Sequence, residues 1–184
     1  MTVSDNQTIV ASTSSSQTFN NRKIAVLPVK TQTSLAPDSV GALRTEVSKR
    51  LGKSLKAKLP SANVSDLSIV AGQLNDKGAL STLEQLVATY ENTGVIDKRH
   101  TATLGRTLGS EFLLLSRLKA EKLDIVISRG MGASLELMLI NAVTGEVVWG
   151  GSGEWKRGGI FGAGKASPDD AADRLVELAF ASLQ

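Results

Sequence analysis

The spacing of apolar residues changes at Glu111. For most of the chain before this residue, apolar side chains recur at steps of three and four, which places them on one face of a helix. After it they alternate with polar or small residues, which places them on one face of a strand. Since each element must bury its apolar face against another, the most economical arrangement is a mixed sheet with helices packed on it.

The predicted elements follow one another in a simple order. A short apolar run at residues 23–29 predicts a buried strand, residues 38–58 form the clearest amphipathic helix, and a second strand is predicted within residues 64–70. The order is β-α-β-α-α-β-β-β-α, which is an α/β (α+β) fold with a mixed sheet of about four to five strands. The other expected elements are a helix between Gly78 and Gly94, a short helix from Asp97 to Gly109, strands at 112–118, 133–140 and 147–155, a hairpin loop at 141–146, and a C-terminal helix that starts at Ser167-Pro168-Asp169-Asp170.

The length and composition indicate one globular domain. The chain has 184 residues, of which 41% are hydrophobic and 21% charged. Its first residues are mostly Ser, Thr, Asn and Gln, and apolar residues such as Ile9, Val10 and Phe19 are too sparse there to bury a face. We therefore expect residues 1–21 to be a flexible polar tether and residues 22–184 to be a single globular domain. No run of 18 or more apolar residues occurs, so we expect no membrane-spanning segment and no signal peptide in this chain.

The residue types that most enzymes use are scarce. There is no Cys, and the single His, His100, is interpreted as a residue at the edge of the core. Without Cys there are no disulfides, no thiol nucleophile and no Cys-ligated zinc, and one His cannot build a His-rich metal site. No pair of Asp or Glu side chains has a spacing that indicates a general acid and base. We therefore expect a protein that is not an enzyme and that uses no cofactor or metal.

The predicted helix at 38–58 is strongly basic, with Glu46 as the acid among its cations. A solvated helix face is the ordinary interpretation. The functional one is an attraction to anionic lipid headgroups or other phosphate-bearing envelope material. Nucleic acid is not an expected partner, because few aromatic residues are available to stack on bases. The candidate contacts with an anionic surface are Arg44, Lys49, Arg50, Lys53 and Lys56.

The last predicted strand places two indoles on the same face. Trp149 and Trp155 are six residues apart, and Gly151 and Gly153 leave slots between them that a helix or a partner's side chain can enter. Core packing is the ordinary interpretation of this pattern, and a recognition groove is the functional alternative.

The loop after this strand, at residues 159–166, nearly matches the phosphate-binding motif G-x-x-x-x-G-K-[ST]. Ala166 stands where a hydroxyl would hold magnesium, and the acidic helix start that follows would repel phosphates, so we expect a glycine-rich connecting loop. Its apolar pair Ile160 and Phe161 has no evident core partner, which makes it a candidate contact for another protein or a second copy. The candidate protein-interaction residues are Trp149, Trp155, Arg157, Ile160, Phe161 and Lys165.

Three segments together resemble a known domain. They are residues 23–29 (KIAVLPV), residues 104–114 (LGRTLGSEFLL) and residues 137–149 (LMLINAVTGEVVW), which ends in a TGE hairpin and a Trp. The pattern resembles the domain shared by CsgG-like curli-secretion lipoproteins, LpoB-like activators of penicillin-binding proteins and the N-terminal domain of TolB.

The resemblance implies an α/β domain in the bacterial envelope that is tethered to a membrane by a lipidated Cys and a flexible polar linker. We hypothesise that Met1 stands where a processed lipoprotein has that Cys. The expected function is a non-enzymatic, periplasm-facing protein, anchored to the outer membrane, that binds and positions another envelope protein or assembles with copies of itself. The alternative is a nucleotide- or polyanion-binding protein that uses residues 159–165 and the basic helix.

Overall fold

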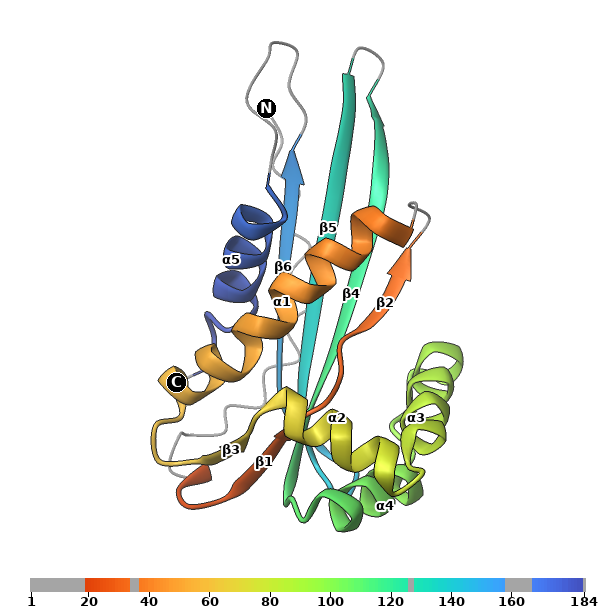
Figure 1. Cartoon of the computed structure of the whole chain (residues 1–184), viewed down its shortest axis with the longest axis vertical. Helices are drawn as coiled ribbons and strands as arrows, with labels where there is room; N and C mark the ends of the chain where they lie inside the picture. Colours follow the sequence, from red (N-terminus) through yellow and green to blue (C-terminus); the bar gives the residue numbers. More distant parts are fainter. Residues whose placement is uncertain (1–18, 34–36, 126–127, 158–166, 184) are drawn as a thin grey trace.

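The computed structural model describes residues 19–33, 37–125, 128–157 and 167–183. Helices and strands are distributed along the chain much as the apolar spacing predicts (Figure 1). In chain order the elements are β1 (Lys23–Val26), β2 (Lys30–Thr33), α1 (Pro37–Lys58), β3 (Asn63–Ser65), α2 (Leu67–Asp76), α3 (Leu80–Thr93), α4 (Lys98–Leu108), β4 (Phe112–Ile125), β5 (Ser128–Asn141), β6 (Val147–Arg157) and α5 (Pro168–Ala179).

The described strands form one mixed sheet of six. Their order is β3-β1-β4-β5-β6, and β2 pairs with β4 further along that strand. β1 runs parallel to β3 and β4, and β2 runs parallel to β4, whereas β4, β5 and β6 form an antiparallel meander. In the β4–β5 hairpin the register runs from Phe112 opposite Asn141 to Ile125 opposite Ser128, so both strands are longer than predicted. The α/β class with a mixed sheet is confirmed, with six strands in place of four to five.

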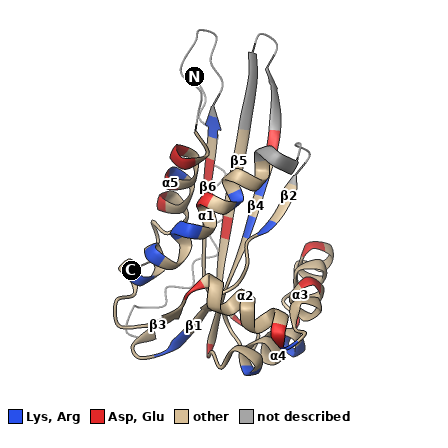
Figure 2. Ribbon diagram, in the orientation of Figure 1, with Lys and Arg blue, Asp and Glu red and all other residues tan. Residues whose placement is uncertain are grey.

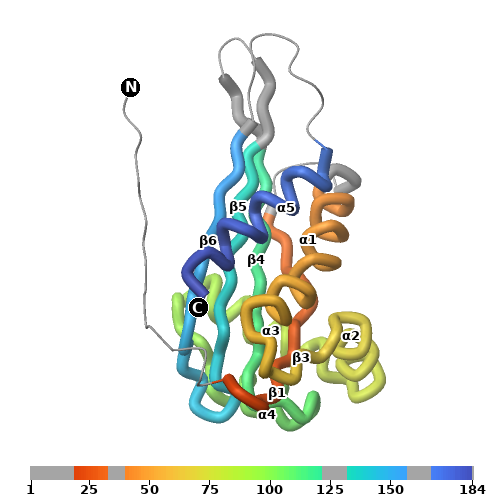
Figure 3. Tube along the Cα trace, turned by 90° about the vertical axis from the view of Figure 1, so that its left-hand side faces the viewer, coloured from red at the N-terminus to blue at the C-terminus, as the bar shows by residue number. Residues whose placement is uncertain are grey.

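The two faces of the sheet carry different helices. In β1, Ile24 and Val26 pack in a core with α1 and α5, whereas Ala25 and the following Leu27 pack in a second core with α2, α3 and α4. Figures 1 and 3 show α1 and α5 side by side along the sheet, and Figure 1 shows α2, α3 and α4 gathered at the end that carries β1 and β3. Strand alternation therefore builds two separate apolar layers from one run of the sequence.

The helix boundaries follow capping residues. The Asp97 carboxylate accepts a hydrogen bond from the N–H of Arg99 at 2.8 Å, and the Ser167 hydroxyl accepts one from the N–H three residues on at 3.1 Å. Gly94 and Gly109 end α3 and α4 in the left-handed conformation, at φ 70° and 62°. The expected helix starts at Asp97 and Ser167 and the expected ends at Gly94 and Gly109 are confirmed.

Two segments differ from the prediction. The strand expected within residues 64–70 is only three residues long, because Asp66 ends it and Val70 and Leu74 are buried one turn apart on α2. β2 was not predicted, because its sequence KTQT has no apolar alternation; it forms by pairing with β4. The observed order therefore contains one more strand and one more helix than the sequence indicates.

The core begins earlier than expected. Phe19, assigned to the polar tether, is fully buried, and its ring meets that of Phe112 edge-on with centroids 5.1 Å apart. The backbone N–H of Asn21 also donates to the carbonyl of Ser61 at 2.8 Å. A single aromatic residue thus fixes the end of the predicted tether to the domain, since burying one large ring is enough to offset the ordering of a few residues.

Candidate functional site

The basic side chains of α1 leave the helix in different directions. Arg50, only 20% exposed, bonds to Asp169 and Asp173 of α5 and, at 2.7 Å, to the carboxylate of Glu46 one turn back on its own helix. Figure 2 shows the basic residues of α1 beside the acidic residues of α5. Arg50 therefore links two helices of the domain, and its charge is already neutralised, which removes it from the candidate contacts with an anionic surface.

The same ion pairs fix the protonation of this cluster. Hydrogen bonds from Lys49 and then Arg50 lower the pKa of Glu46 from 4.5 to about 2. The bond to Asp173 is the main cause that raises the pKa of Arg50. The cluster is thus ionic at neutral pH.

Replacing Glu46 by Gln is expected to make stability less dependent on pH in acid. The folded-state pKa of about 2 lies below the unfolded value of 4.5, so the ion pairs of Glu46 stabilise the fold fully above about pH 5, and this contribution is lost progressively as the pH falls through about 2. The thermal midpoint of Glu46→Gln should lie below that of the natural protein at about pH 6, and the gap should close as the pH falls. Glu154→Gln on β6 controls for the loss of one carboxylate, and a gap that widens in acid would contradict the assignment.

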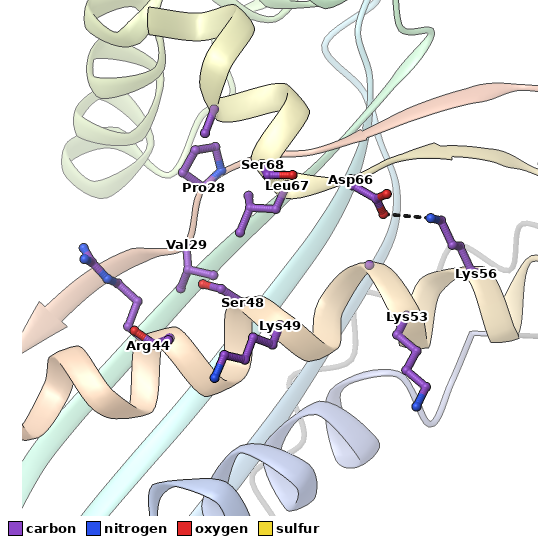
Figure 4. A pocket seen from close by; sticks show the side chains of 13 residues that line it. Pro28, Val29, Arg44, Ser48, Lys49, Lys53, Lys56, Asp66, Leu67 and Ser68 are labelled. Carbon is purple, nitrogen blue, oxygen red and sulfur yellow. Dashed lines mark hydrogen bonds and ion pairs between the residues drawn. The ribbon is translucent and has the colours of Figure 1, made fainter.

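A groove with a volume of about 820 Å³ lies between α1 and the start of α2 (Figure 4). The connection between β1 and β2 closes it at one side. Its wall opposite α1 is largely apolar, and this wall was not foreseen, because its α2 part was predicted as strand. The residues that line the groove are Pro28, Val29, Arg44, Thr45, Ser48, Lys49, Gly52, Lys53, Lys56, Asp66, Leu67, Ser68 and Ala71.

The α1 wall is a stripe of residues four apart. Arg44 and Lys56 stand at its two ends, and the small residues Ser48 and Gly52 lie between them. Lys56 bonds Asp66 across the groove at 2.7 Å, as Figure 4 shows. The groove is therefore bounded by cations at both ends and is open in the middle.

The charges around the groove are unequally available. Lys49 bonds Glu46 at 2.7 Å, and Lys56 is paired with Asp66. In the described part of the chain, no acidic group pairs with Arg44 or Lys53. Figure 4 shows Arg44 at one end of the groove and Lys53 pointing toward α5. Four of the five predicted basic contacts thus line one groove, and Arg44 is the cation at its end that has no acidic partner among the described residues.

The expected slots beside the indoles are filled by the chain's own helix. Trp149 is 4% exposed and stacks on Phe180 with centroids 5.7 Å apart, and Trp155 is partly buried against the same core. A Cβ built on Gly153 would lie 2.5 Å from the carbonyl oxygen of Leu175 in α5. The core-packing interpretation therefore holds for Trp149, which is not available to a partner.

The remaining predicted contacts cannot be placed in the same way. Ile160, Phe161 and Lys165 lie outside the described residues, as does the side chain of Arg157, whose backbone ends β6. Their role as protein contacts stays a prediction.

A second charged cluster, not singled out from the sequence, holds α3 against the other face of the sheet. Arg117 on β4 donates to Glu136 on β5 at 2.7 Å, and its guanidinium lies 5.0 Å from the ring centroid of Tyr90. The Tyr90 hydroxyl donates to Glu136 at 3.2 Å, and burial is the main cause that raises its pKa. Since these groups bond one another, with only the Nε of Arg117 left buried without a hydrogen-bond partner among the described residues, we interpret the cluster as structural. The sequence could have indicated this cluster, because Arg117 and Glu136 carry opposite charges and occupy paired positions on adjacent strands.

Other chemistry is sparse in the described ranges. His100 is 23% exposed, and its Nδ1 lies 3.8 Å from the Asp97 carboxylate, as suits a residue at the edge of the core. Within these ranges, no cluster of three or more His, Asp or Glu residues is arranged to hold a metal ion. Among the described helices, none combines the length and apolarity needed to cross a membrane.

Solved structures of bacterial proteins share this arrangement of elements. The hypothetical protein CT253 from Chlamydia trachomatis matches with a TM-score of 0.51 at 13% identity, over 88% of this chain and 94% of that one. The lipoprotein GNA1162 from Neisseria meningitidis matches with a TM-score of 0.46 at 14% identity, over 74% and 83%. The C-terminal domain of LpoB from Escherichia coli matches with a TM-score of 0.43 at 15% identity, over 76% and 85%.

The chain shares its fold with CT253. The likeness extends over most of its length, so the fold that the three sequence segments imply is confirmed. No family model and no curated protein matches the sequence. At these identities the likeness shows the fold alone and leaves the function to be argued from the surface of the domain.

Proposed function

We propose that this protein is a non-enzymatic protein of the bacterial envelope that faces the periplasm, is anchored to the outer membrane, and binds another envelope protein through the groove between α1 and α2. The similarity to the lipoprotein GNA1162 and to the LpoB domain, and the polar composition of residues 2–18, which suits a linker, support the setting. The groove supports the proposal that the domain binds a protein partner. The protein would act by surface complementarity, positioning its partner without changing any covalent bond.

The observation that carries the proposal is the mixed chemistry of the groove. Pro28 and Leu67, both half-buried, offer an apolar wall, and Arg44 offers a charge with no acidic partner among the described residues. An open concave surface with an apolar wall and a charged rim is typical of sites that bind protein segments.

The alternative, a nucleotide- or polyanion-binding protein, needs several basic side chains on one surface that are not paired with carboxylates of the domain. Of the five basic residues predicted for such a surface, Lys49, Arg50 and Lys56 are each paired with a carboxylate of the domain. This pairing favours a partner that is partly apolar over a densely charged polymer.

A photo-crosslinking amino acid placed at Ser68 in intact cells is expected to give one discrete protein adduct, because Ser68 is exposed on the wall of the groove. Ser81 is the matched control: it is also exposed and is also the second residue of its helix, but it does not line the groove. The adduct should be identified by mass and should disappear when Gly52→Leu fills the groove. Equal adducts from both positions, or adducts with lipid or glycan alone, would refute the proposal.

A further inference from the structure

The α1–α2 groove is opened in its middle by a residue without a side chain. Gly52 lies in the interior of α1, where glycine destabilises a helix relative to alanine. No packing contact explains it, because a Cβ built there would meet only the Asp66 carboxylate, at 3.9 Å. A side chain at this position would instead enter the groove, so Gly52 leaves space for something that approaches the backbone of α1 closely.

The length of the groove fits an extended peptide. Arg44 and Lys56 are twelve residues apart on one helix, which at 1.5 Å per residue is about 18 Å. An extended chain covers this distance in about five or six residues. A lone phosphate or lipid headgroup would occupy one end only and would leave the apolar wall unused.

The groove's chemistry indicates the composition of that peptide. The guanidinium of Arg44 is suited to a bidentate bond with a carboxylate. Pro28, Val29 and Leu67 on the facing wall are suited to an apolar side chain, and Ser48 offers a hydroxyl between the two cationic ends. In an extended peptide alternate side chains point in opposite directions, so acidic and apolar residues in alternation meet the two walls at once.

We infer that the groove binds an extended segment of a partner protein in which acidic and apolar residues alternate. This inference rests on the proposed function and names the kind of segment that the partner supplies. The acidic residues lie toward the α1 wall, where one of them pairs with Arg44, and the apolar residues lie on the wall formed by Pro28 and Leu67.

The test uses a fluorescent hexapeptide of alternating Glu and Leu, with the Gln-Leu counterpart as the neutral probe. Gly52→Leu is expected to weaken binding of the acidic peptide at least about tenfold by filling the groove. Gly41→Leu is the matched control on the same helix: a Cβ there meets nothing within 4 Å, and Gly41 does not line the groove. Leu favours a helix over Gly, so both variants should keep the thermal midpoint of the natural protein or exceed it.

Arg44→Gln tests the electrostatic contribution to binding of the acidic peptide. It should weaken the acidic peptide about fivefold at low salt, change binding of the neutral peptide little, and reduce the salt dependence. Equal binding by the two glycine variants, or equal affinity for the two peptides, would overturn the inference. So would binding of phosphatidylglycerol vesicles or inorganic phosphate that Gly52→Leu abolishes while the peptide stays unbound. If the peptide fails while the Ser68 adduct still forms, the inference falls and the proposed function stands; if the peptide binds and no adduct forms, the proposed function falls.

Discussion

Replacing Trp149 by alanine is expected to lower the free energy of unfolding by about 3–5 kcal/mol. The ring is 4% exposed and stacks on Phe180, with only 5° between the ring planes. Removing it leaves a cavity under α5 and takes away a contact between the sheet and the end of that helix. Urea unfolding followed by far-ultraviolet circular dichroism measures the change without depending on tryptophan fluorescence.

Trp155→Ala is the internal comparison for this result. Trp155 lies on the same face of β6 but is only partly buried, so its replacement should cost clearly less. A loss below about 1 kcal/mol for Trp149→Ala would mean that this ring is not part of the core.

Replacing Gly151 by alanine is the second large effect, with an expected loss of about 3 kcal/mol or more. A Cβ at this position would overlap the carbonyl oxygen of Ala179 and approach the Trp149 ring to 2.7 Å and 2.9 Å. Because the backbone of α5 and a buried indole are the obstacles, a flexible side chain cannot simply rotate away. The helix must lift from the sheet, which the same unfolding measurement and the loss of near-ultraviolet dichroism from the indoles would report.

The neighbouring residue provides a control with the same chemical change. At Gly150 a Cβ would meet only the carbonyl oxygen of Leu137, at 3.7 Å, so Gly150→Ala should change stability by less than about 1 kcal/mol. Equal costs at both positions would show that the loss of glycine in β6, and not the approach of α5, determines the result.

The alternation of residues in β6 could be read from the sequence, whereas its packing partner could not. Period two placed Trp149, Gly151, Gly153 and Trp155 on one face correctly. That α5 would fill the slots depends on which part of the sheet α5 packs against and on the angle at which it crosses the sheet. Neither is a local property of the sequence.

The sequence predicted the α1 side of the candidate site and missed the opposite wall. The basic character of α1 is visible in the sequence, and four of its cations do line one groove. The charge of Arg50 is neutralised by Asp169 and Asp173, more than a hundred residues away, and no local pattern indicates such a pair. The opposite wall was also missed, since the apolar residues before Val70 fit a strand as well as a short helix.

The position of β1 in the sheet affects the order in which the protein can fold. β1 lies between β3 and β4, and its pairing joins Ile24 to Phe112 across most of the first half of the chain. The β4–β6 meander closes through short loops, whereas this parallel pairing must wait for a large and entropically costly closure. During synthesis, a chain that emerges amino end first can pair β1 with β3 early, but it cannot pair β1 with β4 until more than half of its length is free. The two halves of the sheet are therefore joined only after β4 has been made.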